Sequence, residues 1–161
     1  MAENASTINW DKSVDILVVG SGNGALTTAL CSHEMGVKDV LVIEKEEQFG
    51  GSSSISGGGV WIPCNRYALE AGTEDSIADA KSYLSSVIPT GTVPEDLIDV
   101  YLAEGPNMVD FLHDHTRVRY ESLAYYPDYY SDAPGARGGH RSMEPAKLNL
   151  SDLGEDWKKL R

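Results

Sequence analysis

The sequence predicts an α/β fold that opens with a parallel βαβ unit, and three observations support this prediction. A short apolar run rich in β-branched residues, 14–19, is typical of a strand buried on both faces of a parallel sheet. Apolar residues recur at helical spacing from Leu26 to Val37, and Gly36 is the expected end of that helix. A second apolar run, 40–43, predicts the next strand. Because a complete Rossmann-like half needs at least three parallel strands, we interpret the fold as an incomplete domain of this type.

A glycine motif of the form G-x-G-x-x-A lies between the first strand and the helix. Gly20 permits the tight turn, Gly22 lets a pyrophosphate approach the backbone, and Ala25 lets the helix pack close to the strand. Glu44 follows the second strand, where a carboxylate accepts hydrogen bonds from a ribose hydroxyl and repels the 2′-phosphate of NADP. These features predict a dinucleotide site; the alternative is an ordinary βαβ unit with a chance pair of glycines.

A second loop rich in glycine and serine covers residues 49–63. By composition it could be a flexible linker, but apolar residues such as Ile55 and Trp61 interrupt it, which favours an ordered functional loop. Its backbone N–H groups and serine hydroxyls suit phosphate and a sugar-alcohol chain, and its consecutive glycines suit a flat ring. The loop therefore indicates a cofactor larger than NAD.

Two long helices are expected after this loop, and we assign them no chemistry. The first covers residues 73–88, with Thr73 as its N-cap. Pro94 opens the second helix, and the Gly105-Pro106 pair is expected to break or kink it.

A tyrosine-rich loop, 125–135, has neither helical nor strand periodicity, and four of its residues are tyrosines. One interpretation is aromatic packing beneath a loop, in which each hydroxyl finds a partner. The other is a wall of an apolar cleft, with one hydroxyl placed for proton transfer or hydrogen bonding. The residues themselves leave both interpretations open.

Composition and charge exclude several classes of function. The net charge of −12 argues against a nucleic-acid surface and against binding to anionic membranes. No stretch is long and apolar enough to form an integral membrane segment, and the expected compartment is the cytoplasm. We expect no metal site, because His113 and His115 point to opposite sides of a helix and Cys31 and Cys64 have no metal or redox spacing.

Five stretches resemble one family of flavoproteins. They are Val-Val-Gly-Ser-Gly-Asn-Gly-Ala, Phe-Gly-Gly-Ser-Ser, Ser-Gly-Gly-Gly-Val-Trp-Ile-Pro-Cys-Asn, Ala-Gly-Thr-Glu-Asp and Pro-Asp-Tyr-Tyr-Ser-Asp-Ala-Pro-Gly. With Arg141-Ser142-Met143-Glu144-Pro145, they make the chain similar to the N-terminal part of the 3-ketosteroid Δ1-dehydrogenases, within the fumarate-reductase-like FAD flavoproteins. The resemblance extends from about Val14 to Gly154.

The resemblance implies an FAD-binding domain with a defined set of cofactor contacts. The adenosine ribose would lie on Glu44, the pyrophosphate over the first glycine motif, and the isoalloxazine along residues 57–59. No histidine occurs near the serine loop, so FAD is expected to be non-covalent. The expected cofactor-binding residues are Gly20, Ser21, Gly22, Asn23, Gly24, Ala25, Glu44, Lys45, Gly50, Gly51, Ser52, Ser53, Ser54, Ser56, Gly57, Gly58 and Gly59.

The same resemblance implies 1,2-desaturation of the A ring of a 3-ketosteroid, with hydride transfer to flavin and an external electron acceptor. Tyr129 is the expected tyrosine of the proton step, with Tyr130 as the alternate. Alternatives are an inactive truncated fragment or flavin-binding module, a fumarate-reductase-type enzyme, and a Δ4-desaturase. Asn23, Ser53 and Ile55 depart from the usual family pattern, and Ile55 leaves the substrate open.

The expected domain organisation follows from these interpretations. Residues 1–13 form a polar N-terminal tail, and residues 14–161 form the N-terminal part of an FAD-binding domain, truncated before the catalytic domain. Residues 117–120 fit a short strand but not a buried parallel one, so the rest of the parallel sheet is expected outside this sequence.

Overall fold

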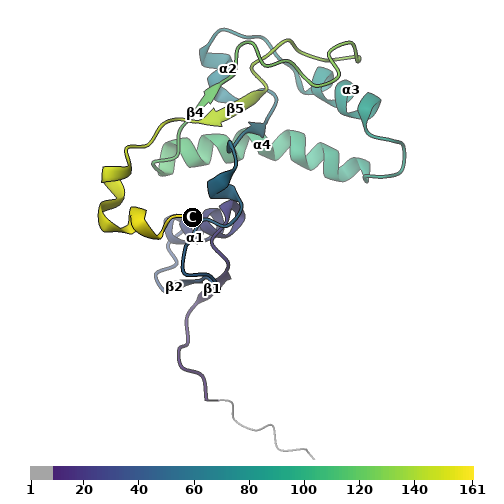
Figure 1. Ribbon diagram of the computed structural model, residues 1–161. Coiled ribbons are helices and arrows are strands. Elements are labelled where there is room, and N and C mark those ends of the chain that lie inside the picture. The colour runs from purple at the N-terminus through teal and green to yellow at the C-terminus, as the bar shows by residue number, and fades with distance from the viewer. Residues whose placement is uncertain (1–8) are drawn as a thin grey trace, which may run out of the picture. The chain divides into compact units, whose positions relative to one another are not determined.

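The computed structural model describes residues 9–161, which form two compact units (Figure 1). Unit 1 comprises the described residues up to Ile55 together with Lys158–Arg161, and unit 2 comprises Ser56–Trp157. Residues 1–8 of the expected polar tail lie outside the described part of the chain.

Unit 1 contains the parallel βαβ arrangement that the sequence predicts. Strand β1 (Ile16–Val19) pairs in parallel with β2 (Val40–Ile43), and helix α1 (Asn23–Glu34) connects them. Gly36 follows the helix with φ of +99°, a conformation that glycine adopts without strain. The prediction of the α/β opening and of its helix end is confirmed.

The strands of unit 1 are less buried than the sequence suggests. Leu17 is 53% exposed and Val19 is 75% exposed, whereas Val18 is buried. The prediction of a strand buried on both faces is therefore wrong for this chain. The physical reason is that β1 and β2 form a sheet of only two strands, which cannot cover both of its own faces.

The remainder of unit 1 is a glycine-rich loop joined to the end of the chain. A short 3₁₀ helix, η1 (Ser53–Ile55), lies within this loop. The backbone N–H of Phe49 donates to the carbonyl of Lys159 at 2.8 Å, and the N–H of Arg161 donates to the carbonyl of Phe49 at 3.0 Å. Both bonds are made at the end of the second short helical stretch, η2 (Leu150–Lys159), which is kinked at Gly154.

Unit 2 is built from helices and a small antiparallel sheet. Its helices are α2 (Arg66–Glu70), α3 (Ile77–Val87) and α4 (Glu95–His115). Its strands are β3 (Val60–Trp61), β4 (Tyr120–Ser122) and β5 (Ser142–Pro145), in the order β3-β5-β4. Met143 lies opposite both Val60 and Ser122, so β5 is the central strand (Figure 1).

The core of unit 2 consists of two small apolar clusters. One joins Ile62, Val109 and Met143, and the other joins Ala80, Ile98 and Leu102. Helix α4 contributes to both clusters, which explains why it is the longest element of the unit.

The structure corrects two expectations about the helices. Ser76, not Thr73, caps α3, because its hydroxyl accepts from the backbone N–H of Asp79 at 3.0 Å. Helix α4 begins after Pro94 as expected, and it continues through Gly105 and Pro106, so the break that the sequence allowed does not occur. Buried side chains on both sides of the pair hold the helix together through tertiary packing, which offsets the hydrogen bond that proline removes.

Gly105 allows a close approach between α4 and the chain after β3. A Cβ at this position would lie 3.2 Å from both Cδ1 and Cγ2 of Ile62. The glycine that reads as a helix breaker in the sequence therefore serves packing. Within the described residues, no helix combines the length and the apolar character needed to cross a bilayer.

Two neighbouring glycines give a test of the packing near β5. A Cβ at Gly139 would lie 2.1 Å from the carbonyl oxygen of Ala124, whereas a Cβ at Gly138 would meet nothing within 4 Å. Gly139→Ala is expected to lower the free energy of unfolding by about 1–3 kcal/mol, because the backbone must move. Gly138→Ala is the matched control and should change it by less than about 0.5 kcal/mol. Equal urea unfolding curves for the two variants would contradict this packing.

Candidate cofactor and substrate site

The glycine motif and the serine loop meet in unit 1. Gly20 has φ of +99°, and Gly22 is the N-cap of α1 without a side chain to bond to the first turn. The hydroxyl of Ser53 accepts from the backbone N–H of Asn23 at 3.0 Å. A Cβ at Gly51 would lie 3.4 Å from the Cα of Gly22, so even a methyl side chain at this position would touch the backbone of the glycine motif.

Ser21 links this cradle to Glu44. The buried hydroxyl of Ser21 donates to Oε2 of Glu44 and accepts from the backbone N–H of Gly50 at 2.9 Å. Oε1 of Glu44 accepts from the N–H groups of Lys45 and Glu46, at 2.8 and 3.1 Å. The hydrogen bond from Ser21, followed by that from the Glu46 backbone, lowers the pKa of Glu44 below its ordinary value. The carboxylate is therefore ionised at neutral pH.

These residues fit the adenosine diphosphate end of a dinucleotide. The first turn of α1 carries no acidic residue, so its N–H groups and partial positive charge face an approaching phosphate without repulsion. The carboxylate of Glu44 lies at the end of β2, where a carboxylate accepts hydrogen bonds from a ribose hydroxyl. The arrangement brings Gly22, Glu44 and Ser53 together, as the sequence predicts.

Other predicted cofactor residues of unit 1 make contacts within the loop, are exposed, or lie in the first turn of α1. The hydroxyl of Ser54 donates to the carbonyl of Gly51 at 3.0 Å, so it stabilises the loop itself. The ammonium of Lys45 lies 3.4 Å from Glu46, and its side chain is exposed. Gly24 and Ala25 lie in the first turn of α1, and Ser52 is exposed on the loop.

Unit 2 contains a cavity of about 470 Å³ between the glycine run and the tyrosine-rich loop. Gly57 and Gly59 line one part of the cavity, and Tyr126, Tyr129 and Tyr130 line another. The remaining lining includes Trp61, Tyr83, Leu84, Val87 and Met143, which give it an apolar character. The tyrosine-rich loop is thus the wall of a cleft, which was one of the two interpretations of its sequence.

The backbone of residues 57–59 is shaped by contacts within unit 2. The hydroxyl of Ser56 accepts from the N–H of Gly58 at 3.0 Å. Gly58 has φ of +66°, and a Cβ there would lie 2.7 Å from Cγ of Pro145. Glycine is therefore required at this position for both conformation and space.

The tyrosine side chains reach into solvent at the cavity. Tyr129 is 84% exposed, and its hydroxyl lies 3.3 Å from the hydroxyl of Tyr126. That hydrogen bond raises the pKa of Tyr126 above its ordinary value. The backbone N–H of Tyr130 donates to the hydroxyl of Tyr83 at 3.3 Å.

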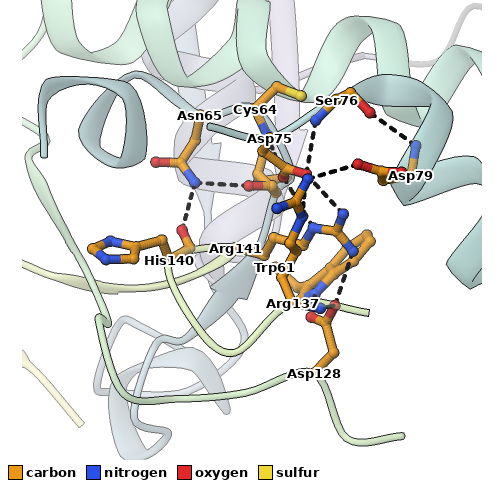
Figure 2. A network of polar contacts seen from close by, with 11 residues as sticks. Trp61, Cys64, Asn65, Asp75, Ser76, Asp79, Asp128, Arg137, His140 and Arg141 are labelled. Carbon is orange, nitrogen blue, oxygen red and sulfur yellow. Dashed lines mark hydrogen bonds and ion pairs between the residues drawn. The ribbon is translucent and has the colours of Figure 1, made fainter. Parts of the chain in front are cut away.

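A buried network of ions, which the sequence reasoning missed, supports this cavity (Figure 2). Arg141 is 2% exposed and donates through Nε and Nη2 to Asp75, at 2.9 and 2.7 Å. Its Nη1 donates to Asp128 at 2.8 Å. Arg137 lies at the edge of the network and donates to Asp79 at 2.6 Å. Asp75, Asp128 and Arg141 all lie in the stretches that carry the family resemblance, but nothing in their spacing predicts that they pair.

The network keeps its central charges ionised. Burial alone would lower the pKa of Arg141, but hydrogen bonds and charges from Asp75 and Asp128 outweigh it and raise that pKa. Burial would likewise raise the pKa of Asp75, and the hydrogen bond and charge of Arg141 lower it below the ordinary value. The pair is therefore held in its charged form.

Within the described residues, no histidine or cysteine lines the cavity, although the backbone N–H of Cys64 donates to Asp75 at 3.2 Å. Nδ1 of His113 lies 2.8 Å from the hydroxyl of Tyr67. Cys31 and Cys64 are free thiols. Among residues 9–161, no three His, Cys, Asp or Glu side chains form a group that could hold a metal ion.

Comparison with known proteins places this geometry in context. Residues 15–160 match the FAD binding domain family. The chain is 42% identical over 142 residues to the 3-oxosteroid 1-dehydrogenase of Mycobacterium tuberculosis strain H37Rv. The aligned region covers 88% of this chain and 25% of that protein. The chain is also 42% identical over 139 residues to the 4-oxocyclohexanecarboxylate 2-dehydrogenase of Sinomonas cyclohexanicum, which covers 86% of this chain and 24% of that protein.

A solved structure matches the fold as well. The 3-ketosteroid Δ1-dehydrogenase of Sterolibacterium denitrificans, in complex with 1,4-androstadiene-3,17-dione, superposes with a TM-score of 0.84 at 40% identity. The superposition covers 92% of this chain and 26% of that one. The chain thus spans about a quarter of the length of the relatives that it matches.

Ser21→Ala tests the link between the two loops of unit 1. Loss of the hydroxyl leaves the buried N–H of Gly50 without its acceptor, which should lower the free energy of unfolding by about 1–3 kcal/mol. The pKa of Glu44 should also rise toward its ordinary value, because the hydrogen bond from Ser21, which lowers it most, is removed. Urea unfolding and an NMR titration of Glu44 measure the two effects.

Ser32→Ala is the matched control, because the hydroxyl of Ser32 bonds only to the Thr28 carbonyl on the helix surface. It should leave both quantities nearly unchanged. An unchanged Glu44 titration in Ser21→Ala would refute the link.

Proposed function

We propose that this chain, which belongs to the FAD binding domain family, forms the FAD-binding portion of an oxidoreductase that desaturates a cyclic ketone, with a 3-ketosteroid as substrate. We further propose that residues 14–161 are the N-terminal part of the FAD-binding domain, after a polar tail of residues 1–13. The catalytic domain would belong to the remaining length that its relatives have.

The observation that carries the proposal is the shared cavity of unit 2. Gly57 and Gly59, assigned to the flavin, line the same space of about 470 Å³ as Tyr129 and Tyr130. An apolar, aromatic lining suits a flat polycyclic substrate, and one hydroxyl suits a proton transfer. The high identity to two dehydrogenases of cyclic ketones agrees with this assignment.

The chain's own residues supply binding and proton handling. The ketone acidifies the neighbouring C2–H of the substrate, and the hydroxyl of Tyr129 assists the removal of that proton. Tyr130 is the alternate group for this step. The apolar side chains of Trp61 and Leu84 pack against the ring system and exclude water. FAD, when bound, supplies the hydride acceptor for C1.

The cofactor residues divide between the two units. In unit 1 they are Gly20, Ser21, Gly22, Asn23, Gly24, Ala25, Glu44, Lys45, Gly50, Gly51, Ser52, Ser53 and Ser54, and in unit 2 they are Ser56, Gly57, Gly58 and Gly59. We propose that FAD is held without a covalent bond, because no histidine occurs in the serine loop.

Turnover requires that reduced flavin be reoxidised, so the proposal includes an external electron acceptor. A cytoplasmic location is also part of it, and two free cysteines agree with a reducing compartment.

A second candidate is a monocyclic ketone as substrate. It is favoured by the equal identity of this chain to the Sinomonas enzyme, whose name specifies a 4-oxocyclohexanecarboxylate. Parallel assays of the longer enzyme with a 3-ketosteroid and with that acid discriminate the two candidate substrates. The compound that fits the cavity should be desaturated, and the other should not. Turnover of neither compound would reject both candidates.

Tyr129→Phe tests the proton step. In the longer enzyme to which we assign this domain, kcat for steroid desaturation should fall about 100-fold while FAD content stays the same. Tyr125→Phe is the matched control, because Tyr125 is almost fully exposed and does not line the cavity. Unchanged turnover in Tyr129→Phe would remove this tyrosine from the mechanism.

Glu44→Ala tests the ribose contact. The dissociation constant for FAD should rise about tenfold or more, because the ribose hydroxyls lose a charged acceptor. Glu46→Ala removes the same charge from the adjacent loop and should change the constant less than about twofold. Fluorescence titration of the apoprotein with FAD measures both, and equal constants would contradict the assignment.

A further inference from the structure

The carboxylate of Asp128, next to Tyr129 in the chain, is buried and accepts three hydrogen bonds. Asp128 is 4% exposed. Its Oδ1 accepts from the indole N–H of Trp61 at 2.7 Å, and its Oδ2 accepts from Nη1 of Arg141 at 2.8 Å and from the backbone N–H of Arg137 at 2.9 Å. The backbone N–H of Asp128 also donates to the carbonyl of Arg137 at 2.9 Å.

These bonds connect two walls of the cavity. Trp61 belongs to β3, which directly follows the glycine run 57–59. The guanidinium of Arg141 lies 5.6 Å from the ring centre of Trp61 and 6.0 Å from that of Tyr83. Tyr83 in turn accepts from the backbone N–H of Tyr130. The buried Arg141 and Asp128 therefore join β3, which follows the glycine run, to the tyrosine-rich loop. Figure 2 shows both side chains beside Trp61.

Tyr129 has little packing of its own to hold it. Its side chain is exposed, and the contact recorded for its hydroxyl is the one to Tyr126. Its Cα is instead held by its two neighbours in the chain, Asp128 through its buried bonds and Tyr130 through its N–H to Tyr83. Because a displacement of about 1 Å at a reacting group can reduce a rate about 100-fold, the anchoring of Asp128 bears directly on the proton step.

We propose that Asp128 is a positioning residue, which acts through Trp61 and Arg141 to hold the Tyr129 hydroxyl at a set distance from the glycine run. This inference rests on the proposed function and deepens it, since it assigns a role in the reaction to a residue that does not touch the reacting atoms. Its role is distinct from that of Asp75, which pairs with the same arginine but lies outside the tyrosine loop.

Asp128→Asn in the longer, FAD-loaded enzyme tests the proposal, because the amide keeps the size of the side chain and removes its charge. We expect kcat for the 3-ketosteroid to fall about 10- to 100-fold, with KM changed less than about threefold and FAD content unchanged. The isotope effect with substrate deuterated at C2 should rise, and the effect with substrate deuterated at C1 should not.

Asp79→Asn is the matched control, since it removes one charge from the edge of the same network, and the Asp79 carboxylate bonds to Arg137 rather than to a residue of the tyrosine-rich loop. It should leave kcat and both isotope effects unchanged. Trp61→Phe serves as a milder second variant, because it removes one donor to Asp128 and keeps an aromatic side chain at the cavity wall, where Trp61 also lies. It should produce the same isotope signature with a smaller loss of kcat, and this keeps the test valid if Asp128→Asn does not fold.

Three results would overturn the inference: an unchanged kcat in Asp128→Asn, equal increases in both isotope effects, or a loss of activity that matches a loss of FAD. The last two indicate a merely structural role. A measurement without substrate separates this inference from the proposed function. In the 161-residue chain, Asp128→Asn should accelerate hydrogen–deuterium exchange in residues 125–136, and Asp79→Asn should not.

If the unmodified longer enzyme fails to desaturate a 3-ketosteroid, the proposed function falls, and the exchange measurement decides alone whether Asp128 holds the loop. Equal exchange in the two variants would refute the anchoring.

Discussion

The burial of the Arg141 guanidinium is the constraint on which unit 2 depends. A cation removed from water costs several kcal/mol unless carboxylates and hydrogen bonds compensate it. Asp75 binds it through two donors and Asp128 through a third, and all three side chains are almost fully buried. Any conformation that separated these segments would leave a buried charge unpaired. The network thus selects one arrangement of the loops, although it need not add much to stability.

This polar network belongs to a unit whose apolar core is small. The two apolar clusters of unit 2 each contain three buried side chains, and its strands are only two to four residues long. Strands β3 and β5 and helix α3 supply one part of the cavity wall. Loops define the rest, and loops hold functional groups accurately only when specific contacts fix them. The bonds from Trp61 and Arg141 to Asp128 are contacts of this kind.

Unit 1 is instead suited to binding an anion through backbone N–H groups. Small residues let Gly22 and Gly51 lie close together, and an acid-free helix start leaves its positive end open. Glu44 adds a negative charge beside this positive end, and Ser21 controls where that charge lies. A phosphate would then bind the N–H groups of the helix start, and a ribose hydroxyl would donate to the nearby carboxylate of Glu44.

The sequence by itself determined the βαβ opening, the glycine cradle, the start of α4 and the composition of the tyrosine-rich loop. These features depend on local periodicity and on the conformational freedom of glycine, which are legible from neighbouring residues. Only the tertiary structure decided that Ser76 caps α3, that α4 continues through Pro106, and that the two apolar strands of unit 1 are only partly buried. It alone brought Asp75 to Arg141, across 66 positions, and the glycine run to Tyr129. Such pairings depend on contacts between distant segments, whose energies no local pattern records.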